Sequence, residues 1–354
     1  MDRKNGRLTA HSHGAGCACK LGPSELAQVL RRLPALEHPD LWVGTDTGDD
    51  AAVWRRPEGR ALVATVDFFT PLVDDPTTWG RIAAANAASD VYAMGGHPLF
   101  ALNVAAWPRD QLRVEMLSDV LIGGAAMAAE GGWMVVGGHT VDGPEPMYGQ
   151  AVVGELVAPE PVTNAGAKAA DALVLTKPLG TGIVATAVKQ MKPGAVEPGG
   201  ELHEAYEAAV GSMTRLNAAA RDIMLEIEAL ACTDITGFGF LGHLQRMTAE
   251  SGVSAVVDAS NVPTFPGVGE LVAQGFVPGG TQRNMQFLER HLDRGAATDA
   301  DLTVLADAQT SGGLLFPCHP MTALEVVAAL GESGHDAAIV GELITGEAGR
   351  LLIR

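Results

Sequence analysis

Apolar positions along the chain fall into short continuous runs that alternate with longer stretches of helical spacing. The runs typical of buried strands occupy residues 61–67, 99–106, 133–137, 148–156, 172–176, 253–258, 313–317 and 337–344. The stretches with helical spacing occupy residues 77–94, 110–130, 203–228, 239–250, 268–274 and 320–333, and another helix begins near 182. Strands that alternate with helices are typical of α/β or α+β domains, and we predict that class.

The same pattern separates an N-terminal arm from two folded units. The first residues show no periodicity, and a helix is expected to begin at Pro23-Ser24-Glu25 with Ser24 as its N-cap. The expected division is a flexible arm over 1–22, an N-terminal α/β domain over 23–157, a polar linker over 157–170 and a C-terminal α/β domain over 170–354. Residues 191–202 and 260–300 are expected to be rich in loops.

The composition is that of a folded, acidic protein. Apolar residues make up 47% of the 354 residues and charged residues 19%, with a formal net charge of −18. Nonspecific binding to nucleic acid needs a surplus of Lys and Arg, so nucleic acid is excluded as the main partner. An anionic ligand would need metal ions or local basic groups to overcome the negative field of the protein.

The sequence predicts a cytoplasmic protein without a membrane segment. Its start, MDRKNGRLTA, has no apolar segment of the signal-peptide kind. The longest apolar run, 99–106, is far shorter than the ~20 residues that cross a bilayer. Cys17 and Cys19 are too close for an easy mutual bridge, and Cys232 and Cys318 lie in apolar contexts that predict buried, inert thiols. This cysteine pattern suits a reducing compartment.

The arm contains the most unusual composition, HSHGAGCACK over residues 11–20. Its glycines allow backbone freedom, and a lysine next to two thiols is expected to lower a thiol pKa, which suits a nucleophile. We therefore interpret the segment as a mobile arm that carries Cys17 and Lys20 to a site elsewhere. The alternative is a structural zinc site made by His11, His13 and the two thiols, but CxC is a poorer zinc spacing than CxxC.

A set of aspartates ends apolar runs or stands next to glycine. Its members are Asp46, Asp49, Asp50, Asp67, Asp90 and Asp234. Carboxylates in apolar surroundings are costly unless they are paired or bound to metal, and such oxygen ligands suit Mg²⁺ that bridges to substrate phosphates. Each aspartate taken alone could instead be a helix cap or a turn residue. As a set they favour a magnesium site.

Three glycine-rich segments could bind phosphate through backbone N–H groups. They are GGHT at 137–140, KPLGTG at 177–182 and QTSGG at 309–313, each expected to be a loop beside a strand or helix. A Walker A loop is absent from the sequence, and so is a GxGxxG fingerprint after the first strand. A nucleotide would therefore bind here without either of these two common devices.

Seven motifs, in this order, resemble those of selenophosphate synthetase (selenide, water dikinase), class I. They are HGAGCACK, GDDAAVW, VDFFTPLVDDP, NAASDVYAMGGHP, GGHTVDGPEPMYG, TDITGFGFLGHL and DAQTSGGLL. The resemblance runs from about residue 8 to the C-terminus, within a superfamily that includes aminoimidazole ribonucleotide synthetase and thiamine-phosphate kinase. Those relatives share the Asp-rich ATP site but lack the Cys/Lys arm. The family arm often reads GCGCK, whereas this chain has Ala18.

The resemblance implies a two-domain aminoimidazole ribonucleotide synthetase-like fold. The N-terminal domains of a homodimer would share a β-barrel, with the ATP sites near the subunit boundary. The implied reaction converts ATP, selenide and water to selenophosphate, AMP and orthophosphate. The product would supply selenium for selenoprotein and selenium-modified tRNA synthesis. The selenium donor, free selenide or a protein-bound perselenide, stays open.

The resemblance also implies roles for particular residues. Cys17 would handle selenium, and Lys20 would contact phosphates. The residues implied at the nucleotide are Lys20, Thr47, Gly48, Asp49, Asp67, Asp90, Gly138, His139 and Thr140. The implied Mg²⁺ ligands are Asp50, Asp90 and Asp234. His139 and Asp234 are candidates for the group that activates water in the second hydrolysis.

Two other functions remain open at this stage. One is an ATP-dependent kinase or ligase of the same superfamily with a different acceptor. The other is a metal or persulfide carrier that uses the HxHxxxCxC segment, with the α/β body as an interaction platform. Nucleotide turnover separates the carrier from the enzymes, and dependence on selenide separates the two enzymes. The number of metal ions, a monovalent ion and the role of Cys19 and the arm histidines also stay open.

Overall fold

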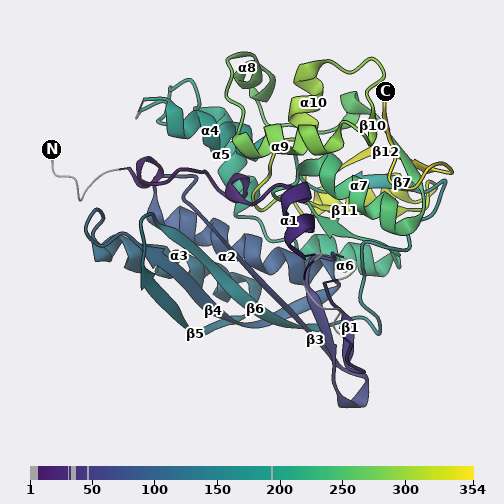
Figure 1. Ribbon diagram of the computed structural model, residues 1–354, viewed down its shortest axis with the longest axis horizontal. Helices are drawn as coiled ribbons and strands as arrows, with labels where there is room; N and C mark the ends of the chain where they lie inside the picture. Colours follow the sequence, from purple (N-terminus) through teal and green to yellow (C-terminus); the bar gives the residue numbers. More distant parts are fainter. Residues whose placement is uncertain (1–6, 31, 33–36, 46–47, 193) are drawn as a thin grey trace.

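Two β-sheets organise the chain in a computed structural model that describes residues 7–30, 32, 37–45, 48–192 and 194–354. The first sheet has six strands in the order β1-β2-β3-β6-β4-β5, and the second has seven in the order β10-β13-β9-β12-β7-β11-β8. Helices pack on both sheets (Figure 1). The predicted mixed α/β class is thus confirmed.

The first sheet is mainly antiparallel, and only β4 and β5 run parallel. Its strands are β1 (Leu41–Val43), β2 (Ala52–Arg55), β3 (Ala61–Phe69), β4 (Gly96–Trp107), β5 (Met134–Asp142) and β6 (Met147–Leu156). Helices α2 (Pro76–Ala93) and α3 (Val114–Gly131) lie side by side on one of its faces (Figure 1). The Asp75 side chain caps α2 by accepting a hydrogen bond from the Thr78 N–H, 2.7 Å away.

Glycines allow α2 and α3 to approach closely. A Cβ atom on Gly80 would lie 2.0 Å from the carbonyl oxygen of Val120, and one on Gly123 would lie 2.0 Å from that of Thr77. The small residues along 77–94 therefore allow this helix packing. This close packing holds the inward side of α2, which includes Asp90, against β3.

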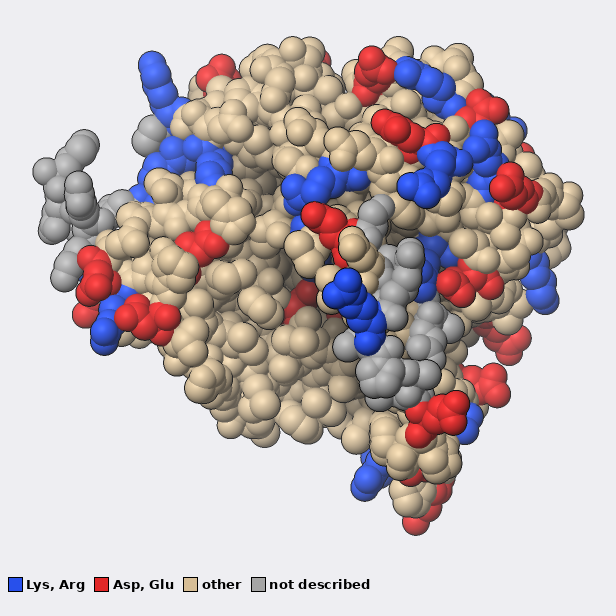
Figure 2. All heavy atoms as spheres, in the orientation of Figure 1, with Lys and Arg blue, Asp and Glu red and all other residues tan. Residues whose placement is uncertain are grey.

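The opposite face of the first sheet carries exposed apolar side chains. Val66 and Phe68 on β3 and Leu102 on β4 are exposed, and so are Met134 and Val136 on β5. Figure 2 shows the surface over β4 and β6 almost without charged side chains. A contiguous apolar face of this kind is typical of a surface that another protein covers.

The second sheet combines antiparallel strands with one parallel edge. Its strands are β7 (Ala172–Leu175), β8 (Thr233–Asp234), β9 (Ser254–Val257), β10 (Leu292–Asp293), β11 (Leu314–Cys318), β12 (Ala338–Ile344) and β13 (Leu351–Ile353). The helices of this part are α4 (Thr181–Gln190), α5 (His203–Met213), α6 (Ala218–Glu226), α7 (Gly239–Ser251), α8 (Val268–Ala273), α9 (Gly279–Leu288), α10 (Asp299–Leu305) and α11 (Ala323–Glu332).

The N-terminal arm runs between the two sheet layers (Figure 1). It forms two 3₁₀ turns, η2 (Leu8–His11) and η3 (Cys17–Cys19), before α1 (Pro23–Leu30). The Gly16 N–H donates to the Thr70 carbonyl, 3.1 Å away, and Cys17 is buried. In this structure the described part of the arm is docked on the protein.

Several sequence predictions of secondary structure need correction. The helix predicted over 203–228 is two helices, α5 and α6, because the chain turns at Asn217, whose buried side chain donates to Ser89 and to the Gly312 carbonyl. The stretch 260–300 contains α8, α9 and β10. The segment GGHT is part of strand β5 and forms no loop, since it pairs with β4.

Candidate active site between the two sheets

Three aspartates from distant parts of the sequence meet where the two sheets approach. Asp50 precedes β2, Asp90 lies on α2 and Asp234 lies on β8. One carboxylate oxygen of each lies within 4.8 Å of the others, and no other group of three such ligands is found among the described residues. The hydroxyl of Thr65 donates to Asp90, and that of Thr233 donates to Asp50 over 2.9 Å.

The environment of these aspartates favours a bound cation. Burial and the neighbouring carboxylates raise the pKa of Asp50 and of Asp90 well above the usual range, and burial raises the pKa of Asp234 to about 6. One oxygen of Asp50 and one of Asp234 are buried without a hydrogen-bond partner among the described residues. Oxygens that lack donors and repel one another fit a Mg²⁺ ion, which binds carboxylate oxygens.

Lys20 and Asp67 form an ion pair beside this cluster. The Lys20 ammonium lies 2.8 Å from Oδ1 of Asp67 and 2.9 Å from Oδ2. Burial lowers the pKa of Lys20, but the negative charge of Asp67 more than offsets this and holds the pKa above its usual range. Lys20 is therefore charged at neutral pH.

Cys17 lies next to this pair through one shared neighbour, Asn86. The Asn86 Nδ2 donates to Asp67 Oδ2 over 2.6 Å, and its Oδ1 lies 3.5 Å from the Cys17 sulfur. The Cys17 N–H donates to the Thr310 hydroxyl over 2.9 Å. The arm thus contacts α2 and the loop before β11 at the same point.

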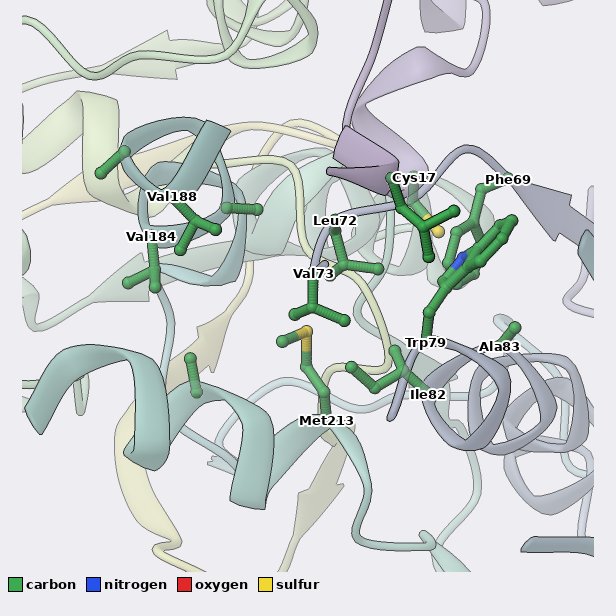
Figure 3. Close-up of a cluster of buried hydrophobic side chains, with 14 of the residues drawn as sticks. Cys17, Phe69, Leu72, Val73, Trp79, Ile82, Ala83, Val184, Val188 and Met213 are labelled. Atoms are coloured by element: carbon green, nitrogen blue, oxygen red, sulfur yellow. The ribbon is translucent and has the colours of Figure 1, made fainter. Parts of the chain in front are cut away.

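The environment of the Cys17 thiol is apolar on one side. Figure 3 shows its side chain beside Leu72 and Phe69 at the edge of a buried cluster. Burial raises the pKa of Cys17, and the positive charge of Lys20 opposes this only in part. Lys20 does lower the thiol pKa, as expected, but burial disfavours the thiolate more strongly, so the pKa of Cys17 stays above its ordinary value in the docked arm.

The rest of the arm is held by polar contacts with both layers. His13 Nδ1 lies 2.7 Å from Glu145, and His11 Nδ1 lies 3.3 Å from Gln111. The Lys189 ammonium donates to the carbonyls of Ser12 and Gly14. Because the histidines face these partners and Cys17 faces Asn86, the four residues of HxHxxxCxC form no metal cluster among the described residues.

The residues expected at the nucleotide fall into separate places. The Gly48 carbonyl accepts from Asn164 Nδ2 over 3.1 Å, and Asp49 accepts from the Asn164 N–H over 2.7 Å. Thr47 and Asp46 lie outside the described residues. Gly138, His139 and Thr140 lie exposed on the edge strand β5, and β4 and β6 separate them from Asp67 on β3. Within one chain, the structure does not bring this last group to Cys17.

Sequence reasoning missed residues that connect the predicted ones. Asn86 stands inside NAASD, and Thr310 and Ser311 stand inside QTSGG, so the motifs contain these residues without marking their side chains. Ser311 donates its N–H to Asn86 Oδ1 over 2.7 Å. Arg283 on α9, which no motif contains, donates to the carbonyls of Ala18 and Lys20. An uncharged hydrogen-bonding residue gives little signal in a single sequence.

Comparison with known proteins identifies the family of the two domains and structures with the same fold. Residues 48–156 match the family model described as AIR synthase related protein, N-terminal domain, and residues 168–354 match the C-terminal domain. Solved structures with this fold include thiamine-monophosphate kinase from Stenotrophomonas maltophilia (TM-score 0.62, 20% identity, 93% of each chain covered). Another is the hydrogenase maturation protein HypE in complex with ATP (TM-score 0.61, 19% identity, 98% of this chain and 93% of that chain covered).

Curated relatives are more similar in sequence. Selenide, water dikinase of Myxococcus xanthus is 45% identical over 346 residues, which are 97% of this chain and 96% of that protein. The protein of the same name from Pelobacter propionicus is 43% identical over 98% of both chains. No helix in the described part of the chain is long and apolar enough to cross a membrane. With both AIR synthase domains and the Cys17–Lys20 arm in place, the chain belongs to the selenide, water dikinase family.

Proposed function

We propose that the site between the two sheets makes selenophosphate from selenide, ATP and water, with Cys17 handling selenium and Lys20 meeting the phosphates of ATP. The observation that carries this proposal is the junction itself. The arm supplies a thiol and a charged lysine, which are linked through Asn86 and Asp67. They lie beside a buried acidic cluster whose aspartates come from both parts of the chain. Phosphoryl transfer depends on such positioning and on charge neutralisation.

The acidic cluster supports a role in holding Mg-ATP. Asp50, Asp90 and Asp234 would hold Mg²⁺, which would neutralise the charge of the triphosphate when bound. Gly48 and Asp49 would line the nucleotide, together with Thr47. When ATP binds, the Lys20 ammonium would move from Asp67 to a phosphate oxygen, which needs only a small displacement of its side chain.

The arm is proposed to act as a lid. The thiol of Cys17 is buried and protonated when the arm is docked, so selenium has to reach it when the arm is open. Docking then excludes water from the reacting groups. Lys189 and Arg283 hold the arm only through its backbone carbonyls, which a limited movement can release.

A homodimer is supported by the open face of the first sheet. A second copy covering Val66, Phe68 and Leu102 would remove apolar surface from water. Such a copy would also place the edge strand β5, with Gly138, His139 and Thr140, at the subunit boundary. This arrangement explains why one chain alone leaves these residues away from Cys17. Free thiols and the acidic surface are consistent with the cytoplasm and with no nucleic-acid partner.

The test is an anaerobic assay with Mg-ATP, with and without selenide, followed by phosphorus NMR and by AMP release. We expect a selenophosphate signal with stoichiometric AMP that depends on selenide. ADP formation without dependence on selenide would indicate a kinase with another acceptor. No turnover, with zinc in the purified protein, would favour the carrier.

A further inference from the structure

Ser311, in the loop between α10 and β11, is held in a conformation that serine rarely adopts. Its φ angle is +49°, in the left-handed region that favours glycine. Glycine follows it twice, at Gly312 and Gly313, yet serine stands at the left-handed position. The residue is 2% exposed, and its hydroxyl has no hydrogen-bond partner among the described residues. An unpaired buried hydroxyl in a strained residue is typical of a functional site.

The strained conformation is fixed from both sides of the residue. The Ser311 N–H donates to Asn86 Oδ1 on α2, 2.7 Å away. Its carbonyl accepts from Nζ of Lys177, 3.1 Å away, and Lys177 also donates to the Arg215 carbonyl over 2.7 Å. Lys177 is itself buried. Two elements distant in sequence therefore hold Ser311 in place, although neither contacts its hydroxyl.

Ser311 also adjoins the groups around the Cys17 thiol. Asn86, whose Oδ1 accepts from the Ser311 N–H, also contacts the Cys17 sulfur with that oxygen. The hydroxyl of Thr310, the residue before Ser311, accepts from the Cys17 N–H. Asn86 has both ends of its amide engaged, Oδ1 with Ser311 and Nδ2 with Asp67. The hydroxyl of Ser311 is therefore a hydrogen-bond donor that this side of the site has not yet used.

We propose that Ser311 is a substrate-binding residue whose hydroxyl donates a hydrogen bond to the anionic selenium substrate next to Cys17. Hydrogenselenide is an anion that accepts hydrogen bonds, so it gains from an O–H group that is already desolvated and has no competing partner among the described residues. Lys177 and Asn86 are the positioning residues that orient the serine backbone. This inference rests on the proposed function, since Cys17 has to be the residue that handles selenium.

Two variants separate the hydroxyl from the backbone strain. Ser311→Ala removes the hydroxyl and keeps a side chain in the left-handed region, whereas Ser311→Gly removes the hydroxyl and relieves the strain. The matched control is Glu228→Gly, which relieves the same kind of strain at an exposed residue with φ of +52°. We expect both Ser311 variants to raise the KM for selenide about tenfold while the KM for ATP stays within about twofold. Ser311→Gly should melt no lower than the wild type.

The outcomes distinguish this inference from the proposed function. A wild-type KM for selenide in Ser311→Gly would show that the residue only shapes the loop and would overturn the inference. An equal rise in the KM for ATP would overturn it as well, because the contact would then be with the nucleotide. Selenide binding without ATP, measured by anaerobic calorimetry, gives a readout that does not need turnover. If the wild type binds selenide but makes no selenophosphate, the proposed function fails, while weaker binding by Ser311→Gly would still support the role of Ser311.

Discussion

The ammonium of Lys20 lies 2.8 Å from the carboxylate of Asp67, so the cation that the arm brings to the site is already paired when the arm is docked. The contact joins the arm to β3. Asn86 links it to Cys17, because the Asn86 amide contacts both Asp67 and the Cys17 sulfur. The proposed contact of Lys20 with phosphate would therefore use the same charge that pairs the docked arm with Asp67.

Removal of the Lys20 charge should lower activity with ATP more than it lowers the stability of the fold. We expect Lys20→Ala to lower kcat/KM for ATP by about a hundredfold, because a charge-assisted contact to the transferring phosphoryl group is lost. The matched control is Lys168→Ala, which removes an exposed lysine. Steady-state kinetics with varied ATP checks the prediction, and an unchanged kcat/KM in Lys20→Ala would mean that Lys20 serves only to dock the arm.

The two arm thiols should differ in reactivity although only Ala18 separates them. Cys17 is buried with a raised pKa, whereas Cys19 is half-buried. Since the thiolate is the reactive form, iodoacetamide should modify Cys19 well before Cys17 in the protein without ligands. Mass spectrometry of digests after timed labelling measures this order. Faster modification of Cys17 would mean that the docked arm is a minor state.

Activity should follow the opposite order. Cys17→Ser should abolish selenide-dependent turnover, and Cys19→Ser should have a mild effect, because one thiol is enough for the proposed chemistry. The anaerobic assay with phosphorus NMR compares the two variants directly. Full activity of Cys17→Ser would remove the proposed role of this residue in handling selenium.

The sequence indicates the candidate functional residues more clearly than the local structure around them. Cys17 and Lys20 stand out because two thiols beside a lysine have few structural uses, and the aspartates stand out only as a set; the fold brings Lys20 and Asp67 together and gathers Asp50, Asp90 and Asp234. The sequence favours a loop at GGHT, because glycine turns are common. Instead, Gly138 allows β5 to approach β4 closely, since a Cβ atom there would lie 2.3 Å from the Asn103 carbonyl.

Other features depend on long-range contacts that no local pattern encodes. Asn86 and Ser311 are ordinary residues until α2 and the loop before β11 meet, and 225 positions separate them in sequence. The rise in the pKa of Cys17 is likewise a result of burial in the docked arm, which a flexible segment would not produce. The sequence therefore indicates the groups that cluster in the fold and gives little signal for the residues that contact them.

The acidic cluster should destabilise the protein when no cation is present. Asp234→Asn removes one of three mutually repelling buried groups, so we expect it to melt a few degrees (about 2–4 °C) higher than the wild type in EDTA. Addition of Mg²⁺ should stabilise the wild type more than the variant, by mass action on the folded state. Thermal unfolding with and without Mg²⁺ checks both points. Equal responses of the two proteins to Mg²⁺ would argue against a metal site at these aspartates.

The open face of the first sheet should mediate self-association. Phe68→Glu puts a charge among exposed apolar side chains and should shift the protein to monomers in sedimentation experiments. The matched control is Leu324→Glu, which changes an exposed apolar residue on α11, in the domain of the second sheet. This variant should leave the association unchanged. A monomeric wild type would contradict the proposed dimer, and so would a dimer that survives Phe68→Glu without weakening.

Lys177 should make stability depend on pH in the alkaline range. Burial lowers its pKa to about 7, an effect that the charge of Asp234 opposes and that of Arg215 reinforces. Burial also lowers the pKa of the adjacent His335 to about 4, so that this imidazole stays neutral between pH 7 and 9. In the unfolded chain a lysine keeps its proton up to a pKa of about 10.4.

Between these two values the unfolded state binds more protons than the folded state, so the Lys177 contribution to stability rises with pH, by at most about 1.4 kcal/mol per pH unit. Lys177→Met removes this contribution. Compared with the variant, the wild type should gain stability from pH 7 to pH 9, which melting temperatures at pH 7, 8 and 9 would measure. A constant difference between the two proteins over this range would mean that Lys177 stays protonated in the fold, held by the carbonyls of Ser311 and Arg215.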